Sequence, residues 1–241
     1  MTDPLDHVLA TNLPTASRPL MGLTVLVVED SRFASEAMRL LCLRSGARIR
    51  RADSLRAARR HLAVFRPTVV IVDLGLPDGS GAELIADLSA AHPRVGVILG
   101  MSGDAGAEAV CHAAGADGFI EKPISSLSAF QNVVISHLPP DMRPTGMRLV
   151  SNDSIDPDPL ALLDDLAHVS DLLTDSNELD QASIRYAVQF LQGLARLTDD
   201  RPLSDVADQL SAHHFSGEPI SSDIARFAGL VQQRITQQRA V

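Results

Sequence analysis

Lysine is almost missing from this chain. Of the 21 basic side chains among its 241 residues, only Lys122 is a lysine, and it stands directly before Pro123. An ammonium group is a compact, mobile point charge, whereas the guanidinium group of arginine is a planar fork. Lys122 is therefore either an isolated surface lysine or a position that needs an ammonium, such as a tight pocket for anionic phosphoryl oxygens.

Cysteines and long apolar runs are also scarce. The two cysteines, Cys42 and Cys111, fall on predicted helices outside any CxxC pattern, so we expect buried, reduced thiols. The sequence has no run of about 18 apolar residues, and its first residues lack a basic stretch followed by an apolar core. These absences argue against a membrane span and a signal peptide, and they predict a cytoplasmic protein with no membrane partner.

Short β-branched runs that end in polar residues alternate with helical periodicity. Val25–Val28 leads into Glu29 and Asp30, and Val69–Val72 leads into Asp73. Two further apolar runs end at Ser102 and shortly before Lys122. The pattern predicts strands near 24–28, 48–51, 68–72, 95–101 and 117–121, and helices near 31–45, 54–64, 82–91, 105–114 and 124–137.

This alternation predicts an α/β fold with a doubly wound, five-stranded parallel sheet. The ligand site of such a sheet lies beyond the carboxyl ends of the strands, where the winding reverses. Because crossovers between parallel strands are right-handed, Asp30, Asp73, Ser102 and Lys122 should meet at one edge.

The motifs Val27–Ser31, Asp73–Gly81, Ser102 and Lys122–Pro123 resemble those of the receiver domain of bacterial two-component response regulators. This is the CheY-like family, which has a flavodoxin-like fold. The resemblance covers roughly residues 22–138, and we expect the receiver domain to span residues 21–138. It implies that Asp73 is the phosphoacceptor and that Asp30, Asp73 and the backbone carbonyl of Gly75 bind Mg²⁺, with Glu29 acting through water. It also implies that Ser102, Phe119 and Lys122 act in the switch, with Lys122 as the counter-ion of the phosphoryl group.

The residue types suit this chemistry. Mg²⁺ prefers oxygen ligands, and phosphoryl transfer depends mostly on positioning and on neutralising the transferred oxygens. The carboxylate of Asp73 would be the nucleophile that forms an acyl phosphate. Three positions depart from the usual family pattern: Ser102 replaces a threonine, Phe119 stands where a tyrosine often serves, and Gly75 leaves one flank of the acceptor without a side chain.

The rest of the chain predicts three further segments. Residues 1–20 read as an N-terminal tail or a short helix, and the proline-rich stretch 139–158 reads as a linker. Residues 159–241 carry four stretches of helical periodicity, which predict a small all-α helical bundle as the output or interaction domain. The apolar face expected of the second stretch consists of Leu179, Tyr186, Phe190, Leu194 and Leu197.

The predicted output domain is acidic. From Val150 to the end the chain carries 15 acidic residues and six arginines, whereas residues 1–149 carry 15 of each sign. Because a DNA-binding domain needs a basic face, we expect output through a protein target or a second copy, with nucleic acid less favoured. The alternative is a transcription factor with a helix-turn-helix-like region around residues 206–225.

No motif indicates an enzymatic output. His168 lacks the neighbours of a phosphotransfer histidine, and His213 and His214 read as the end of a helix rather than a metal site. The expected protein is thus a phosphoacceptor rather than an enzyme. The resemblance implies that it receives its phosphoryl group from a sensor histidine kinase or a histidine phosphotransferase.

Overall fold

The computed structural model describes residues 13–104, 106–124, 126–144, 155, 157–174 and 180–238. The chain divides into two compact units, one comprising residues 1–30 and 35–156 and the other residues 31–34 and 157–241. Most of the predicted N-terminal tail, residues 1–12, and of the predicted linker, residues 145–154 and 156, lie outside the described residues.

The first unit is built on a five-stranded sheet in the order β2-β1-β3-β6-β7, and every pairing is parallel. This confirms the predicted doubly wound fold. The winding reverses between β1 and β3, because β2 lies on one side of β1 while β3, β6 and β7 follow on the other. The strands are β1 (Thr24–Val28), β2 (Arg48–Ala52), β3 (Val69–Asp73), β6 (Val97–Ser102) and β7 (Gly118–Glu121). A two-stranded hairpin of β4 (Gly75–Leu76) and β5 (Gly79–Ser80) follows β3.

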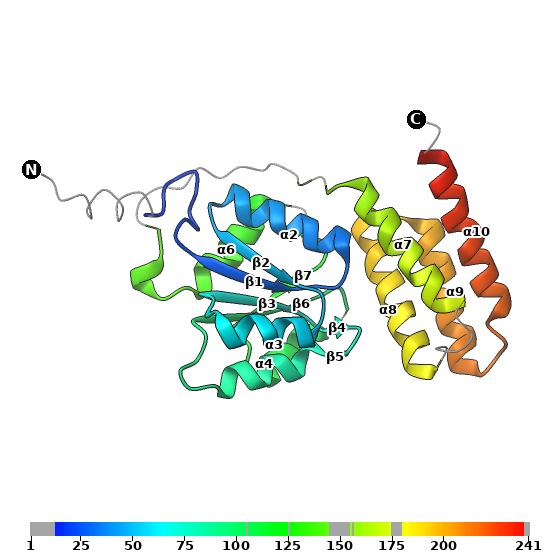
Figure 1. The fold of residues 1–241 in the computed structure, drawn as a ribbon, viewed down its shortest axis with the longest axis horizontal. Coiled ribbons are helices and arrows are strands. Elements are labelled where there is room, and N and C mark those ends of the chain that lie inside the picture. Colours follow the sequence, from blue (N-terminus) through cyan, green and yellow to red (C-terminus); the bar gives the residue numbers. More distant parts are fainter. Residues whose placement is uncertain are drawn as a thin grey trace, which may run out of the picture. The chain divides into compact units, whose positions relative to one another are not determined.

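Helices cover both faces of this sheet, as Figure 1 shows. One core lies between the sheet and α2 and α6, and the other lies between the sheet and α3, α4 and α5. The helices are α2 (Arg32–Arg44), α3 (Leu55–Val64), α4 (Gly81–Ala90), α5 (Ala107–Ala113) and α6 (Leu127–His137), and a 3₁₀ helix, η1 (Pro140–Met142), follows.

Side-chain caps fix several helix starts. The hydroxyls of Ser54, Ser80 and Ser126 accept hydrogen bonds from backbone amides in the first turns of α3, α4 and α6. The cap at Ser126 places the start of α6 three residues later than the sequence predicted. The predicted start of β6 at residue 95 was also too early, because the strand begins at Val97.

The second unit is a helical bundle of α7 (Pro159–Thr174), α8 (Gln181–Thr198), α9 (Arg201–Ser216) and α10 (Ser221–Gln238). Each helix packs against two others, in the cyclic order α7, α8, α9, α10. Side chains of Asp180 and Asp200 cap α8 and α9 by accepting hydrogen bonds from the amides of Ser183 and Leu203. The predicted four-helix region is confirmed.

The apolar face of α8 differs from the one that the sequence suggested. The sequence pointed to Leu179, Tyr186, Phe190, Leu194 and Leu197. Leu179 lies outside the described residues, and of the other four only Leu194 is buried. The buried residues of α8 are Ile184, Ala187, Val188, Leu191, Leu194 and Ala195. This face combines branched aliphatic side chains with two alanines, which allow close helix approach, and it leaves the two aromatic rings only partly covered.

Cys42 and Cys111 are both buried, and neither forms a disulfide. Burial raises the pKa of the Cys42 thiol to about 12 and that of Cys111 to about 11, so neither thiol is ionised near neutral pH. Within the described residues, every helix is too short or too polar to span a bilayer.

Candidate functional site

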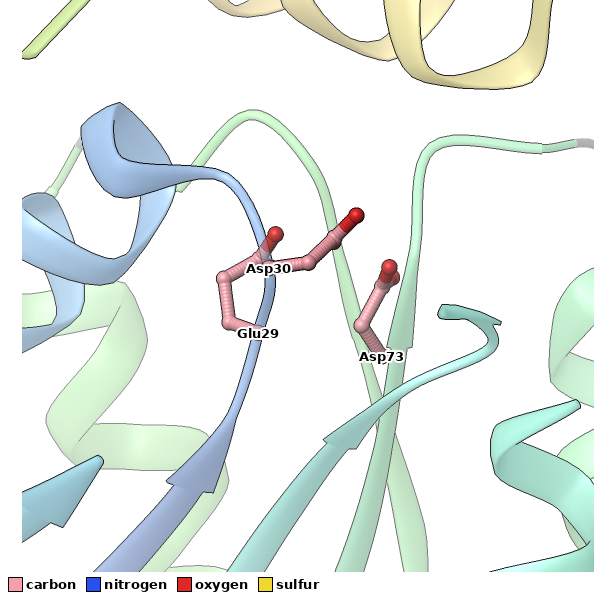
Figure 2. A group of neighbouring side chains, drawn as sticks. All are labelled: Glu29, Asp30 and Asp73. Atoms are coloured by element: carbon pink, nitrogen blue, oxygen red, sulfur yellow. The ribbon is translucent and has the colours of Figure 1, made fainter. Parts of the chain in front are cut away.

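Three carboxylates converge at the carboxyl edge of the sheet. Glu29 and Asp30 directly follow β1, and Asp73 is the last residue of β3, so the two strands on either side of the winding reversal supply them. Each residue offers a carboxylate oxygen, and these oxygens lie within 4.8 Å of one another (Figure 2). Glu29 and Asp73 are buried, whereas Asp30 is partly exposed.

Lys122 supplies a positive charge to this cluster. Its ammonium Nζ lies 2.6 Å from Glu29 Oε2 and 3.0 Å from Asp73 Oδ1, and its side chain is 11% exposed. Burial lowers the pKa of the Lys122 ammonium, but the negative charges of Asp73 and Glu29 outweigh burial and raise the pKa above its usual value. The ammonium therefore stays charged across the physiological range.

Glu29 is the most strongly perturbed carboxyl group of the cluster. Burial raises the pKa of Glu29 well above its ordinary value; Lys122 opposes this, and Asp73 and Asp30 add to it. Three carboxylates and one ammonium leave an excess of negative charge. A cluster of carboxylate oxygens with that excess fits a divalent cation with a preference for oxygen ligands.

The other predicted residues lie around this cluster. Ser102 ends β6, is buried, and its backbone carbonyl accepts a hydrogen bond from the amide of Lys122 at 2.9 Å. Its hydroxyl oxygen accepts a hydrogen bond from the amide of Asp104 at 3.2 Å. Phe119 lies in β7, partly buried against the core that contains α3, α4 and α5, and Gly75 begins β4. The roles assigned to these residues stay predictions.

Two residues that follow Asp73 within eight positions, Asp78 and Gly81, have structural roles that the sequence did not reveal. A Cβ atom on Gly81 would lie 1.9 Å from the carbonyl oxygen of Asp73, so only glycine fits this position. The carboxylate of Asp78 accepts hydrogen bonds from the amides of Leu55 and Arg56 at 2.8 and 2.9 Å. Asp78 thus attaches the β4–β5 hairpin to the first turn of α3, a long-range contact that no local pattern could indicate.

The sequence predicted the position of His213 at a helix end but not its contact with another helix. His213 does lie in the last turn of α9, but its Nδ1 atom is also 2.6 Å from the buried carboxylate of Asp223 in α10. His168 is exposed on α7.

Residues 25–133 match the family model of the response regulator receiver domain. Together with the sheet order and the carboxylate cluster, this match identifies that part of the chain as a receiver domain. The match ends before α7, so it does not describe the helical bundle.

The chain is similar to known regulatory proteins over about 100 residues. The chain is 32% identical over 99 residues to the KDP operon transcriptional regulatory protein KdpE of Escherichia coli K12, a match that covers 41% of this chain and 44% of KdpE. It is 31% identical over 100 residues to the virulence transcriptional regulatory protein PhoP of Salmonella typhimurium LT2, covering 41% of this chain and 45% of PhoP. The chain thus aligns with less than half the length of these relatives.

Solved structures include similar domains. A CheY-like response regulator receiver domain protein from Methanospirillum hungatei JF-1 has a TM-score of 0.43 and 21% identity, covering 48% of this chain and 93% of that one. The chemotaxis response regulator CheY4 of Vibrio cholerae has a TM-score of 0.41 and 20% identity, covering 48% of this chain and 98% of that one.

Proposed function

We propose that this chain is a response regulator of a two-component system in which Asp73 accepts a phosphoryl group in an Mg²⁺-dependent reaction. The observation that supports this most directly is the buried ion cluster, in which the one lysine of the chain contacts Asp73 at 3.0 Å beside two further carboxylates. A lone surface lysine, the other reading of the sequence, would be exposed and would not have such contacts.

In the proposed reaction, a carboxylate oxygen of Asp73 attacks phosphorus, and the bond from phosphorus to the histidine nitrogen of the donor breaks. The donor is a sensor histidine kinase or a histidine phosphotransferase. Asp30, Asp73 and the carbonyl of Gly75 would hold Mg²⁺, with Glu29 acting through water, and the ion would offset the charge of the phosphoryl oxygens. Lys122 lies close enough to Asp73 to pair with one of those oxygens.

The same residues suggest how the product is sensed. The ammonium of Lys122 forms ion pairs with both Glu29 and Asp73. A phosphoryl group on Asp73 would compete with these carboxylates for the ammonium. The hydroxyl of Ser102, at the end of the neighbouring β6, could donate to another phosphoryl oxygen if it turned from its present hydrogen bond with Asp104. A shift of the β6 and β7 ends would then change how deeply the ring of Phe119 is buried. Such a local rearrangement would carry the signal from Asp73 to the surface of the receiver domain.

For the output we propose control of transcription, because both relatives described above are named transcriptional regulators. The second candidate is a protein target or a second copy of this chain. It is favoured by the excess of acidic residues from Val150 onwards, which disfavours phosphate contacts by that region.

Phosphorylation is tested by incubating the full chain with acetyl phosphate and Mg²⁺ and measuring intact mass. We expect one added phosphate in the wild type and none in Asp73→Asn. Asp53→Asn is the matched control, because Asp53 also follows a strand end but is exposed and outside the cluster. A stoichiometric adduct on Asp73→Asn would assign the phosphate to another residue. Titration with Mg²⁺ should show weaker binding for Asp30→Ala than for Asp53→Ala.

The two outputs are separated by incubating the phosphorylated chain with fragmented genomic DNA and sequencing the retained fragments. Enrichment of defined sites that depends on Asp73 phosphorylation supports transcription control. Uniform recovery, together with phosphorylation-dependent self-association in sedimentation experiments, supports the protein-contact output instead.

A further inference from the structure

A cluster of arginines lies on β2 and α3, outside the carboxylate site. Residues 44–66 contain eight arginines and a single acidic residue, Asp53. We use the name arginine face for four of them, all exposed: Arg48 and Arg50 in β2, and Arg56 and Arg60 in α3.

The strand and the helix present these side chains on one side of the sheet. β2 is an edge strand, and its alternation turns Ile49 towards the core under α2 and α6 and Ala52 towards the core under α3. The two strand arginines have the same parity as Ala52 and therefore point to the α3 side. In α3, Leu55 and Ala58 are buried, so the two helix arginines, one turn apart, lie on the ridge that faces solvent.

Carboxylates do not neutralise this face. Within the described part of the chain, the side chains of Arg48, Arg56 and Arg60 make no ion pair with an acidic residue, whereas the neighbouring Arg51 and Arg59 pair with carboxylates of α2 and α4. The guanidinium of Arg50 lies 4.4 Å from the centre of the Phe65 ring. This stacking orients the guanidinium and leaves the N–H groups on its edges available to an anion.

Two carboxylates close in sequence or in space to the start of α3, Asp53 and Asp78, already have hydrogen-bond donors. Asp53 accepts a hydrogen bond from the hydroxyl of Ser54 at 2.9 Å. Asp78 is occupied by the two backbone amides at the start of α3. Both lie at the carboxyl end of the sheet, whereas Arg48 begins β2 at the opposite end.

We propose that the arginine face binds the phosphodiester backbone of nucleic acid. Arginines two apart on a strand repeat at about 6.6 Å, and those one turn apart on a helix at about 6 Å. Such an array of planar guanidinium forks suits a polyanion that carries a charge at every repeat. The inference rests on the proposed transcriptional output, and it assigns the phosphate contacts to the receiver because the region after Val150 is acidic.

The test is fluorescence anisotropy of a labelled generic DNA duplex titrated with the full chain, at several salt concentrations. The variant Arg48→Gln, Arg56→Gln, Arg60→Gln should bind at least tenfold more weakly at low salt. The slope of log K against log salt should become shallower by up to about 0.9 for each lost phosphate contact. The matched control is Arg185→Gln, Arg201→Gln, Arg226→Gln, which removes the same charge from exposed positions of the bundle.

Equal affinity of the triple variant and the wild type would overturn the proposal, as would an equal loss in the bundle control. Polyglutamate that competes as well as DNA at equal charge would assign the face to an acidic polypeptide and also overturn it. Hydrogen exchange shows whether the variant is folded. Intact mass after incubation with acetyl phosphate reports Asp73 separately, so a failed phosphoacceptor assignment and a failed nucleic-acid assignment give different results.

Discussion

Replacing Lys122 with methionine should destabilise the receiver, because it leaves a buried group of carboxylates without their ammonium. The Nζ atom contacts Glu29 at 2.6 Å and Asp73 at 3.0 Å, and methionine keeps an unbranched side chain of similar length without the charge. Removing one partner from a buried ion pair costs about 3–5 kcal/mol. Since about 1.4 kcal/mol corresponds to a factor of ten, the open state of β1 and β3 should become about a hundredfold to several thousandfold more populated.

Amide hydrogen exchange is the suitable assay. The chain has no tryptophan, and its single tyrosine, Tyr186, lies in α8, so intrinsic fluorescence does not report on the sheet. Protection factors of β1 and β3 should fall by about two to three and a half orders of magnitude in Lys122→Met at about pH 8 without Mg²⁺. Lys122→Arg is the companion variant, because it keeps the charge but replaces the ammonium with a larger planar group.

The effect should depend on pH in a defined direction. Burial raises the pKa of folded Glu29, so its contribution to stability is present below the ordinary glutamate pKa of about 4.3 and is lost as pH rises through the raised value. Without Lys122 the pKa rises further, and the difference from wild type should be largest at about pH 8 and shrink as pH falls. Unchanged protection in Lys122→Met, or a difference that grows on acidification, would refute the role assigned to this charge.

Three further outcomes are expected. Asp78→Ala should destabilise the first turn of α3 by about 1.5–3 kcal/mol, measured by hydrogen exchange, because a carboxylate that accepts two amide hydrogen bonds is lost. Gly100→Ala should lower the melting temperature, since its Cβ would lie 2.0 Å from Cys111 Sγ, whereas Gly193→Ala in α8 meets nothing within 4 Å and should raise it. Asp223→Asn should lower the pKa of His213 in an NMR titration, because the hydrogen bond to Asp223 is the main cause of its raised value. In wild type, the stability linked to His213 is present below the ordinary histidine pKa of about 6.5 and lost as pH rises through the raised value.

The sequence alone determined the receiver fold and the membership of its carboxylate cluster. β-branched runs alternating with amphipathic segments are local patterns, and they predict a parallel sheet because crossovers have one hand. Once the sheet is parallel, residues that follow its strands must meet at one edge. For that reason Asp30, Asp73, Ser102 and Lys122 could be grouped before any distance was known.

Only the tertiary structure decided which of these groups touch. The contact between Lys122 and Glu29 depends on side-chain reach across two strand ends, and the bond from Asp78 to α3 depends on how a hairpin folds back. In the bundle, the rotation of α8 depends on which neighbours approach it, so aliphatic side chains and two alanines lie inside where the sequence pointed to the aromatic rings of Tyr186 and Phe190. Such contacts join residues far apart in the chain. The periodicity of one segment shows which of its faces is apolar, but it does not show how a neighbouring helix or strand approaches that face.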